Sequence, residues 1–280
     1  MKLILMAILI LFPLTASATI NILYMNDECA IYASDSRITG DFNYISSDSF
    51  EKLTKVSKYA IARIQGKMSI KDRHFKAFIS DFKGNYGINN ESEIYIDSIR
   101  VLFDQYIDSL EIRNNCDFSG SIGFAGLSSM NRFTSYSYYD RNFNFKEDSC
   151  RVHGYYMKAW GTTFAYNRII FGVDSILLSY LNKDLEMLPP DSLRKPIIGL
   201  IKAHLDSTSL ALNISSIEDA INFVYTLTKS SIEIDNACQG RYYKNDFIPY
   251  YPSLGGDVLM LIVTREGAKW IKPPDYCVDQ

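Results

Sequence analysis

The sequence has few of the residues and motifs from which common catalytic and metal sites are built. Its three histidines, His74, His153 and His204, lie far apart, and its five cysteines include no C-x-x-C pair. A zinc site is therefore not expected, because such sites draw on closely spaced Cys and His ligands. The chain also lacks the G-x-S-x-G, H-E-x-x-H, G-x-x-x-x-G-K-[ST] and G-x-G-x-x-G patterns. We expect no metal and no cofactor.

An excess of positive charge is also missing. The chain has 29 Lys and Arg against 32 Asp and Glu, which gives a formal net charge of -3. This balance argues against a nucleic-acid partner. The 47% of hydrophobic residues and 22% of charged residues are typical of a globular protein. No Pro/Gly/Ser-rich linker, charge block or repeat divides the chain, so we expect residues 19–280 to form a single domain.

The first eighteen residues have the pattern of a secretory signal peptide. Lys2 precedes an apolar run from Leu3 to Leu14, and small residues lead to Ala18. This run is too short for the ~20 residues of a membrane-spanning helix, and no later run approaches that length. We therefore expect a secreted or periplasmic protein that has no stable membrane span and begins at Thr19 after cleavage between Ala18 and Thr19.

The five cysteines favour disulfides in such a compartment, with one thiol left over. Cys29 lies in an apolar run and is the expected free thiol. The other four allow three pairings, of which we favour Cys116 with Cys150 and Cys238 with Cys277.

The spacing of apolar residues alternates between the periods of strands and of helices. Short apolar or alternating runs predict strands at 20–25, 29–33, 59–64, 122–127, 133–139, 258–263 and 269–271. Helical spacing appears at 75–82, 99–110, 163–180, 190–205 and 215–227. Ser215 with Glu218 fits a capping box for the last helix. The many tyrosines between 121 and 156 fit half-buried strands better than a ligand groove. The order predicts an α+β fold of antiparallel sheets covered by helices.

Cleavage before Thr19 would place a free α-amine beside a hydroxyl. An α-amine has a pKa of ~7.7–8.0 and can take the hydroxyl proton, so one residue supplies both nucleophile and base. Thr19 is therefore the first candidate catalytic residue.

Further residues follow Thr19 in a recognisable order. They are Ala33-Ser34-Asp35-Ser36-Arg37, Lys52, Gly66, Gly161-Thr162 and Gly255-Gly256. In kind, order and spacing they resemble the proteasome β-subunit family of N-terminal nucleophile (Ntn) hydrolases. The resemblance covers essentially the whole chain after residue 18, with an extra segment around 181–213. It implies a four-layer αββα sandwich, in which two antiparallel sheets lie between helix layers, and it leaves assembly into a homo-oligomer open.

The resemblance also implies a role for each residue. Thr19 would attack a carbonyl, and Lys52, paired with Asp35, would lower the cost of the alkoxide. The backbone N–H of Gly66 would face the developing oxyanion, and Thr162 would replace a serine hydroxyl. Arg37 would hold Asp35 and nearby backbone, while Gly161, Gly255 and Gly256 match the glycines of the family.

One part of the family pattern is missing. The family has an Asp and a Ser shortly before the paired glycines, which hydrogen-bond the amine of the nucleophile. Tyr251 and Leu254 occupy the matching positions here. The candidate substitutes are Ser253, Asp257 and Asp246.

The sequence thus predicts a threonine-type hydrolase that cleaves an amide, with peptide substrates favoured by the resemblance. Two alternatives stay open. One is an Ntn amidase that acts on a small-molecule amide. The other is an inactive relative that keeps the fold for binding or assembly, which the missing Asp and Ser favour and the retained Thr19, Asp35 and Lys52 disfavour.

Overall fold

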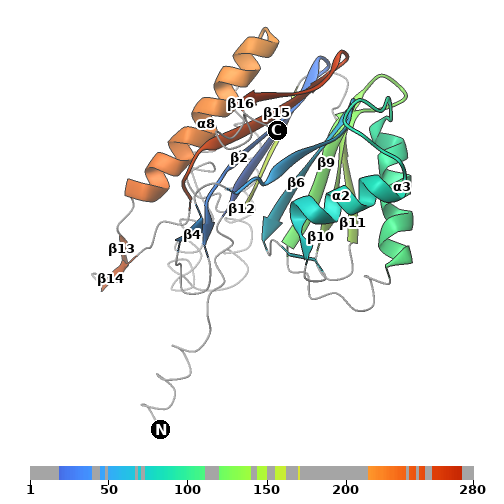
Figure 1. Cartoon of the computed structure of the whole chain (residues 1–280). Coiled ribbons are helices and arrows are strands. Elements are labelled where there is room, and N and C mark those ends of the chain that lie inside the picture. Colours follow the sequence, from blue (N-terminus) through green and yellow to red (C-terminus); the bar gives the residue numbers. More distant parts are fainter. Residues whose placement is uncertain are drawn as a thin grey trace, which may run out of the picture.

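The structure is a computed structural model that describes residues 19–39, 45–47, 50–66, 69–70, 73–110, 120–139, 144–149, 155–161, 170, 214–237, 240–243, 246–249 and 254–272. Within them lie two five-stranded antiparallel sheets and three helices, so the predicted α+β class is confirmed (Figure 1). The expected signal peptide and the helix predicted at 190–205 fall outside these residues, as does the helix at 163–180 apart from residue 170.

The first sheet has the strand order β12-β1-β2-β15-β16. Its strands are β12 (Tyr156–Gly161), β1 (Ile20–Met25), β2 (Cys29–Asp35), β15 (Val258–Thr264) and β16 (Gly267–Lys272). The predicted strands β1 and β2 form an antiparallel hairpin, and β15 pairs with β2 although the two lie far apart in sequence. Every residue of β1 and β2 is buried. Burial on both faces explains why these runs are continuously apolar instead of alternating.

The second sheet has the order β11-β10-β9-β6-β5. Its strands are β11 (Asn144–Ser149), β10 (Phe133–Tyr139), β9 (Gly120–Leu127), β6 (Ala60–Gly66) and β5 (Leu53–Ser57). Three short strand pairs complete the strands: β3 (Ile38–Thr39) with β4 (Ile45–Ser47), β7 (Ser69–Ile70) with β8 (Arg73–His74), and β13 (Gly240–Tyr243) with β14 (Asp246–Pro249).

The three helices pack on different sheets. The helices α2 (Phe75–Asn85) and α3 (Ile96–Ser109) share one buried apolar cluster with β6, β9 and β10. The helix α8 (Ile217–Ala237) shares a second cluster with β1, β2 and β15. A third cluster joins residues of both sheets, among them Leu23, Tyr32, Ile61 and Trp160. Figure 1 shows α8 and the α2–α3 pair on opposite sides of the two sheets.

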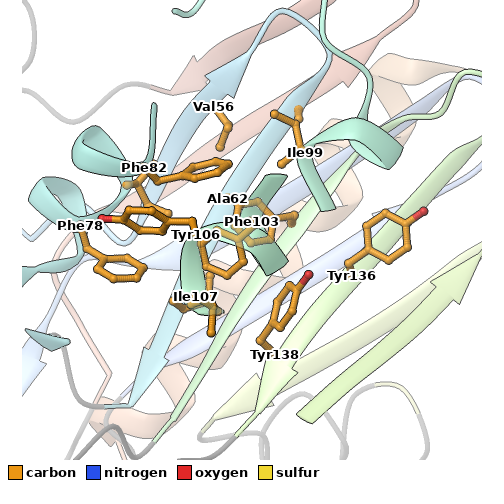
Figure 2. Close-up of a cluster of buried hydrophobic side chains, with 14 of the residues drawn as sticks. Val56, Ala62, Phe78, Phe82, Ile99, Phe103, Tyr106, Ile107, Tyr136 and Tyr138 are labelled. Carbon is orange, nitrogen blue, oxygen red and sulfur yellow. The ribbon is translucent and has the colours of Figure 1, made fainter. Parts of the chain in front are cut away.

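Aromatic side chains dominate the cluster under α2 and α3 (Figure 2). Phe103 lies 4.7 Å from Phe124 and 5.0 Å from Tyr138 between ring centroids, in tilted or edge-on geometry. Such pairs contribute about 0.5–1.5 kcal/mol each beyond the area that they bury. Tyr136 and Tyr138 of β10 are buried here, which agrees with the prediction that these tyrosines pack in strands, although β10 is buried on both faces and not on one.

The start of α8 corrects the predicted cap. The helix begins at Ile217, so Ser216 is the capping residue, and its Oγ accepts a hydrogen bond of 3.0 Å from the N–H of Asp219. Ser215 instead donates to the Asp219 carboxylate at 2.8 Å. The Ser215–Glu218 assignment was therefore wrong by one residue. The strand β5 was not predicted, because the polar Thr54 and Lys55 interrupt its apolar pattern.

Candidate active site

Thr19 immediately precedes β1 and is 1% exposed. The next residue, Ile20, pairs with Gly161 of β12. Gly161 has a φ of +93°, and a Cβ at this position would overlap the Thr19 carbonyl oxygen. The Ser34 hydroxyl donates to the carbonyl oxygen of Ile20 at 3.0 Å. The backbone around Thr19 is therefore held from both neighbouring strands, and only glycine fits at residue 161.

Asp35 ends β2 and accepts hydrogen bonds from three directions. Its Oδ1 lies 2.8 Å from the Lys52 ammonium and 3.0 Å from the N–H of Ile20. Its Oδ2 accepts from the N–H of Gly255 at 3.4 Å. Both Asp35 and Lys52 are 0% exposed. The structure thus brings Asp35 and Lys52 together and places their pair beside the first peptide group after Thr19.

Burial affects both partners of this pair. It raises the pKa of Asp35 above its ordinary value, an effect opposed by the charge and hydrogen bond of Lys52 and by the N–H groups of Ile20 and Gly255. Burial also lowers the pKa of Lys52, which the Asp35 carboxylate opposes. Removing two charges from water is costly, and a buried ion pair rarely stabilises a fold more than an apolar pair of similar volume. The Asp35–Lys52 pair is therefore weak evidence for a role in stability.

Gly66 ends β6 in the second sheet, with a φ of +85°. The N–H of Ile64 donates to the Lys52 carbonyl at 3.0 Å, so the segment that carries Lys52 is fixed to this strand. The Asn21 side-chain amide donates to the Ile64 carbonyl at 3.1 Å. One backbone hydrogen bond thus connects the end of β6 with the Lys52 segment, and one side-chain hydrogen bond connects it with the start of β1.

Arg37 contacts the segment before β15. Its Nη1 donates to the Leu254 carbonyl at 2.8 Å and to the Asn236 side chain at 3.3 Å, and its backbone N–H donates to the Gly255 carbonyl at 3.1 Å. A Cβ at Gly255 would overlap the Arg37 guanidinium, and Gly256 follows with a φ of +67°. These contacts agree with the part of the prediction that concerns nearby backbone; that Arg37 also holds Asp35 stays a prediction.

The sequence prediction missed Asp235, in the last turn of α8. This carboxylate is 0% exposed and accepts a hydrogen bond of 2.8 Å from the N–H of Leu254. Leu254 is one of the two positions that match the Asp and Ser of the family pattern. The other, Tyr251, lies outside the described residues, as do Ser253 and the side chain of Asp246.

A signal for Asp235 was present in the sequence. Its neighbours on the buried face of α8 are Ala220, Val224, Leu227, Thr228, Ser231 and Ile232. A carboxylate at this helical spacing from apolar and small residues is unusual, because charged side chains are almost never fully buried without a partner. The prediction did not reach Asp235 because the family's Asp and Ser were matched by counting residues back from Gly255. That count ends in the segment between α8 and β15, before it reaches the helix. Of the proposed substitutes, Asp257 is exposed, and its N–H donates to the Ser36 hydroxyl at 2.7 Å.

Thr162 lies outside the described residues, as do Cys116, Cys150, Cys238 and Cys277. Cys29 is buried and free, as predicted. The part of the chain that the structure describes contains no group of three or more His, Cys, Asp or Glu side chains placed to hold a metal ion. Within the same part, none of the helices is both long enough and apolar enough to cross a bilayer.

A cavity of about 210 Å³ lies at the opposite end of β15 from Gly255, near Thr264, Gly267 and Lys55. Two of its lysines form ion pairs with exposed glutamates, Lys58 with Glu93 at 2.5 Å and Lys55 with Glu91 at 3.7 Å. Such exposed pairs are ordinary surface features.

No protein-family model matches this chain, and no curated protein matches it.

Proposed function

We propose that this protein is a secreted or periplasmic N-terminal threonine hydrolase, which cleaves an amide bond through an acyl-enzyme ester on Thr19. The observation that carries the proposal is the buried Asp35–Lys52 pair, held at 2.8 Å and joined through Asp35 to the N–H of Ile20. A charged group close to a threonine is one of the arrangements that can activate its hydroxyl.

The arrangement of the elements supports the same proposal. The helix α8 covers one sheet, α2 and α3 cover the other, and an apolar layer joins the two sheets. We propose that this is the four-layer αββα sandwich of Ntn hydrolases. The proposal includes removal of residues 1–18 by signal peptidase, which would create the α-amine of Thr19 without self-cleavage.

The reaction would proceed in two steps. The Thr19 α-amine takes the proton of Oγ, Oγ bonds to the amide carbonyl carbon, and the C–N bond breaks as the proton passes to the leaving amine. Water, activated by the same amine, then hydrolyses the ester and restores Thr19. Lys52 supplies positive charge beside the hydroxyl, and the N–H of Gly66 would donate to the oxyanion, a contact typically worth ~10²–10³ in rate.

Asp235 weakens the alternative of an inactive relative. The absence of an acid before the paired glycines favoured that alternative, but the structure places a buried carboxylate against Leu254 by way of α8. We propose that Asp235 takes over the positioning of the amine. A peptide substrate remains favoured, and a small-molecule amide is the second candidate.

The test is to determine the intact mass and N-terminal sequence of the exported protein after treatment with a threonine-reactive β-lactone. We expect a chain that begins at Thr19 and carries one acyl group on that residue. Thr19→Ala should remain folded and unlabelled, while Thr54→Ala, on β5, should be labelled normally. A different N-terminus, or labelling of the Thr19→Ala variant, would contradict the proposal.

A further inference from the structure

The proposed reaction needs groups from both sheets at a fixed separation. Thr19 precedes β1 in the first sheet, whereas Gly66 ends β6 in the second. An error of about 1 Å between a nucleophile and a stabilising donor can cost ~10² in rate. The contacts that span the two sheets near these residues therefore determine whether the site is assembled.

One such contact joins Arg63 of β6 and Trp160 of β12. The guanidinium carbon of Arg63 lies 4.0 Å from the centre of the Trp160 ring. Arg63 is three positions before Gly66 on the same strand, and Trp160 directly precedes Gly161, whose backbone lies against the Thr19 carbonyl. The Arg63–Trp160 stack therefore connects the strand that ends in the oxyanion donor with the neighbour of the nucleophile.

The stack is held on both sides. The Arg63 Nη1 donates to the Ser121 hydroxyl at 2.8 Å, and the Trp160 Nε1–H donates to the Tyr139 hydroxyl at 3.2 Å. The Lys158 ammonium lies 4.9 Å from the same tryptophan ring. These bonds fix the guanidinium to β9 and the indole to β10, both in the second sheet, so the stack has one defined geometry.

The surroundings make room for a large buried cation. Arg63 is 0% exposed and is the largest fully buried side chain among the residues that the structure describes. A Cβ on Gly123 of β9 would lie 2.7 Å from the Arg63 Nε and 2.9 Å from the Tyr32 hydroxyl. Leucine or methionine would fill such a space at lower cost, because burying a charge is expensive. Filling the core therefore does not by itself account for an arginine at this position.

We propose that Trp160 and Arg63 are positioning residues, whose stack sets the separation between Thr19 and the N–H of Gly66. This inference rests on the proposed threonine hydrolase. On this inference, the cation–π contact between the two sheets aligns the oxyanion donor with the nucleophile. Arg63 is better suited than lysine because its planar guanidinium stacks on an aromatic ring.

The experiment compares Trp160→Leu with Trp270→Leu. Trp270, on β16, is the other tryptophan of the chain and borders the same apolar layer between the sheets. For Trp160→Leu we expect kcat to fall by ~10–10², with KM within about twofold of the wild type by the same reasoning. Trp160→Phe should recover part of kcat, because an aromatic face returns. Trp270→Leu should keep kcat.

A second measurement distinguishes a lost alignment of the oxyanion contact from a general loss of rigidity in the protein. Sulfur accepts hydrogen bonds poorly, so the ratio of turnover between an amide substrate and its thioamide reports the oxyanion contact. This ratio should fall in Trp160→Leu and Arg63→Lys but not in Trp270→Leu. A folded Trp160→Leu that matches Trp270→Leu in kcat and in this ratio would overturn the inference. If Trp160→Leu does not fold, Trp160→Phe and Arg63→Lys decide by the same ratio. β-Lactone labelling of wild-type Thr19 tests the proposed function separately, since it uses no substitution at Trp160 or Arg63.

Discussion

Asp35 and Asp235 accept hydrogen bonds from consecutive backbone amides. Gly255 donates to Asp35 Oδ2 at 3.4 Å, and Leu254 donates to Asp235 Oδ2 at 2.8 Å. Both carboxylates are fully buried, one at the end of β2 and the other in the last turn of α8. The segment before β15 thus connects two acids that come from distant parts of the chain, and we expect both to be needed for activity.

The first prediction concerns the charge of Asp235. Asp235→Asn keeps the size of the side chain and an oxygen for the Leu254 N–H but removes the negative charge. We expect kcat to fall at least ~10-fold, in the range of a lost acid–base or positioning group, while thermal unfolding shows a folded protein. Glu233→Gln, an exposed position on the same helix, is the control and should keep full activity. Equal activity of the two variants would remove Asp235 from the site.

The second prediction concerns the contact between Gly161 and Thr19. Gly161→Ala should strongly destabilise the protein and abolish turnover, because the added Cβ overlaps the Thr19 carbonyl and the φ of +93° is strained for alanine. Gly87→Ala is the matched control, since Gly87 has a φ of +64° but nothing within 4 Å of the added Cβ. It should cost only the ~1–2 kcal/mol of a left-handed alanine. Urea unfolding measures both, and similar losses would show that the contact is unimportant.

The third prediction is a pH dependence of stability. Burial raises the pKa of Asp35, and Lys52 opposes that effect, so Lys52→Met should raise the Asp35 pKa further. A folded pKa above the unfolded value of ~3.9 gives stability that is present at low pH and lost as the pH rises through the folded pKa. The free energy of unfolding of Lys52→Met should therefore fall between pH 4 and 7 relative to the wild type, by about 1.4 kcal/mol for each added pKa unit.

Urea unfolding at several pH values measures this slope. Lys229→Met, which removes an exposed lysine that lies 4.0 Å from Glu233, should follow the wild type. Parallel curves for Lys52→Met and wild type would mean that Lys52 does not hold the charge of Asp35.

The fourth prediction concerns the thiol of Cys29. Burial, together with the neighbouring Glu28 charge, raises its pKa to about 12, and the side chain is 0% exposed. Because the thiolate is the reactive form, iodoacetamide at pH 8 should leave Cys29 unmodified in the native protein and alkylate it after denaturation. Mass spectrometry of the Cys29 peptide gives the result, and rapid native alkylation would contradict the buried position of β2.

Most elements of the fold could be predicted from local patterns. Continuous apolar runs gave β1, β2 and β15, and helical spacing gave α2 and α3, each within a few residues of the observed bounds. The start of α8 was predicted equally well, but the helix continues to Ala237, beyond the predicted end at residue 227. Turn residues and apolar periodicity depend only on nearby sequence, which is why these predictions succeeded. The strand β5 and the cap at Ser216 were missed because tertiary pairing and the exact helix start decided them.

The candidate site also contains residues that the sequence predicted and one residue that it did not. The order and spacing of Thr19, Asp35, Lys52 and Gly66 are properties of the sequence. They support the hypothesis of an N-terminal nucleophile without information on contacts. Asp235, the residue that α8 contributes, could not be predicted by counting. It lies 19 positions before Leu254 in the sequence, although the two are hydrogen-bonded in the structure. A buried acid on an apolar helix face was the available signal.

The sequence by itself determined the three helices, most strands of the two sheets and the candidate residues for the proposed chemistry, because each of these depends on residue type and short-range spacing. Only the tertiary structure decided which groups meet. β15 pairs with β2, which brings Gly255 to Asp35 across 220 positions, and the packing of the two sheets sets Arg63 against Trp160. The physical reason is that hydrogen bonds and ring contacts act over a few ångströms in space, whatever the distance along the chain.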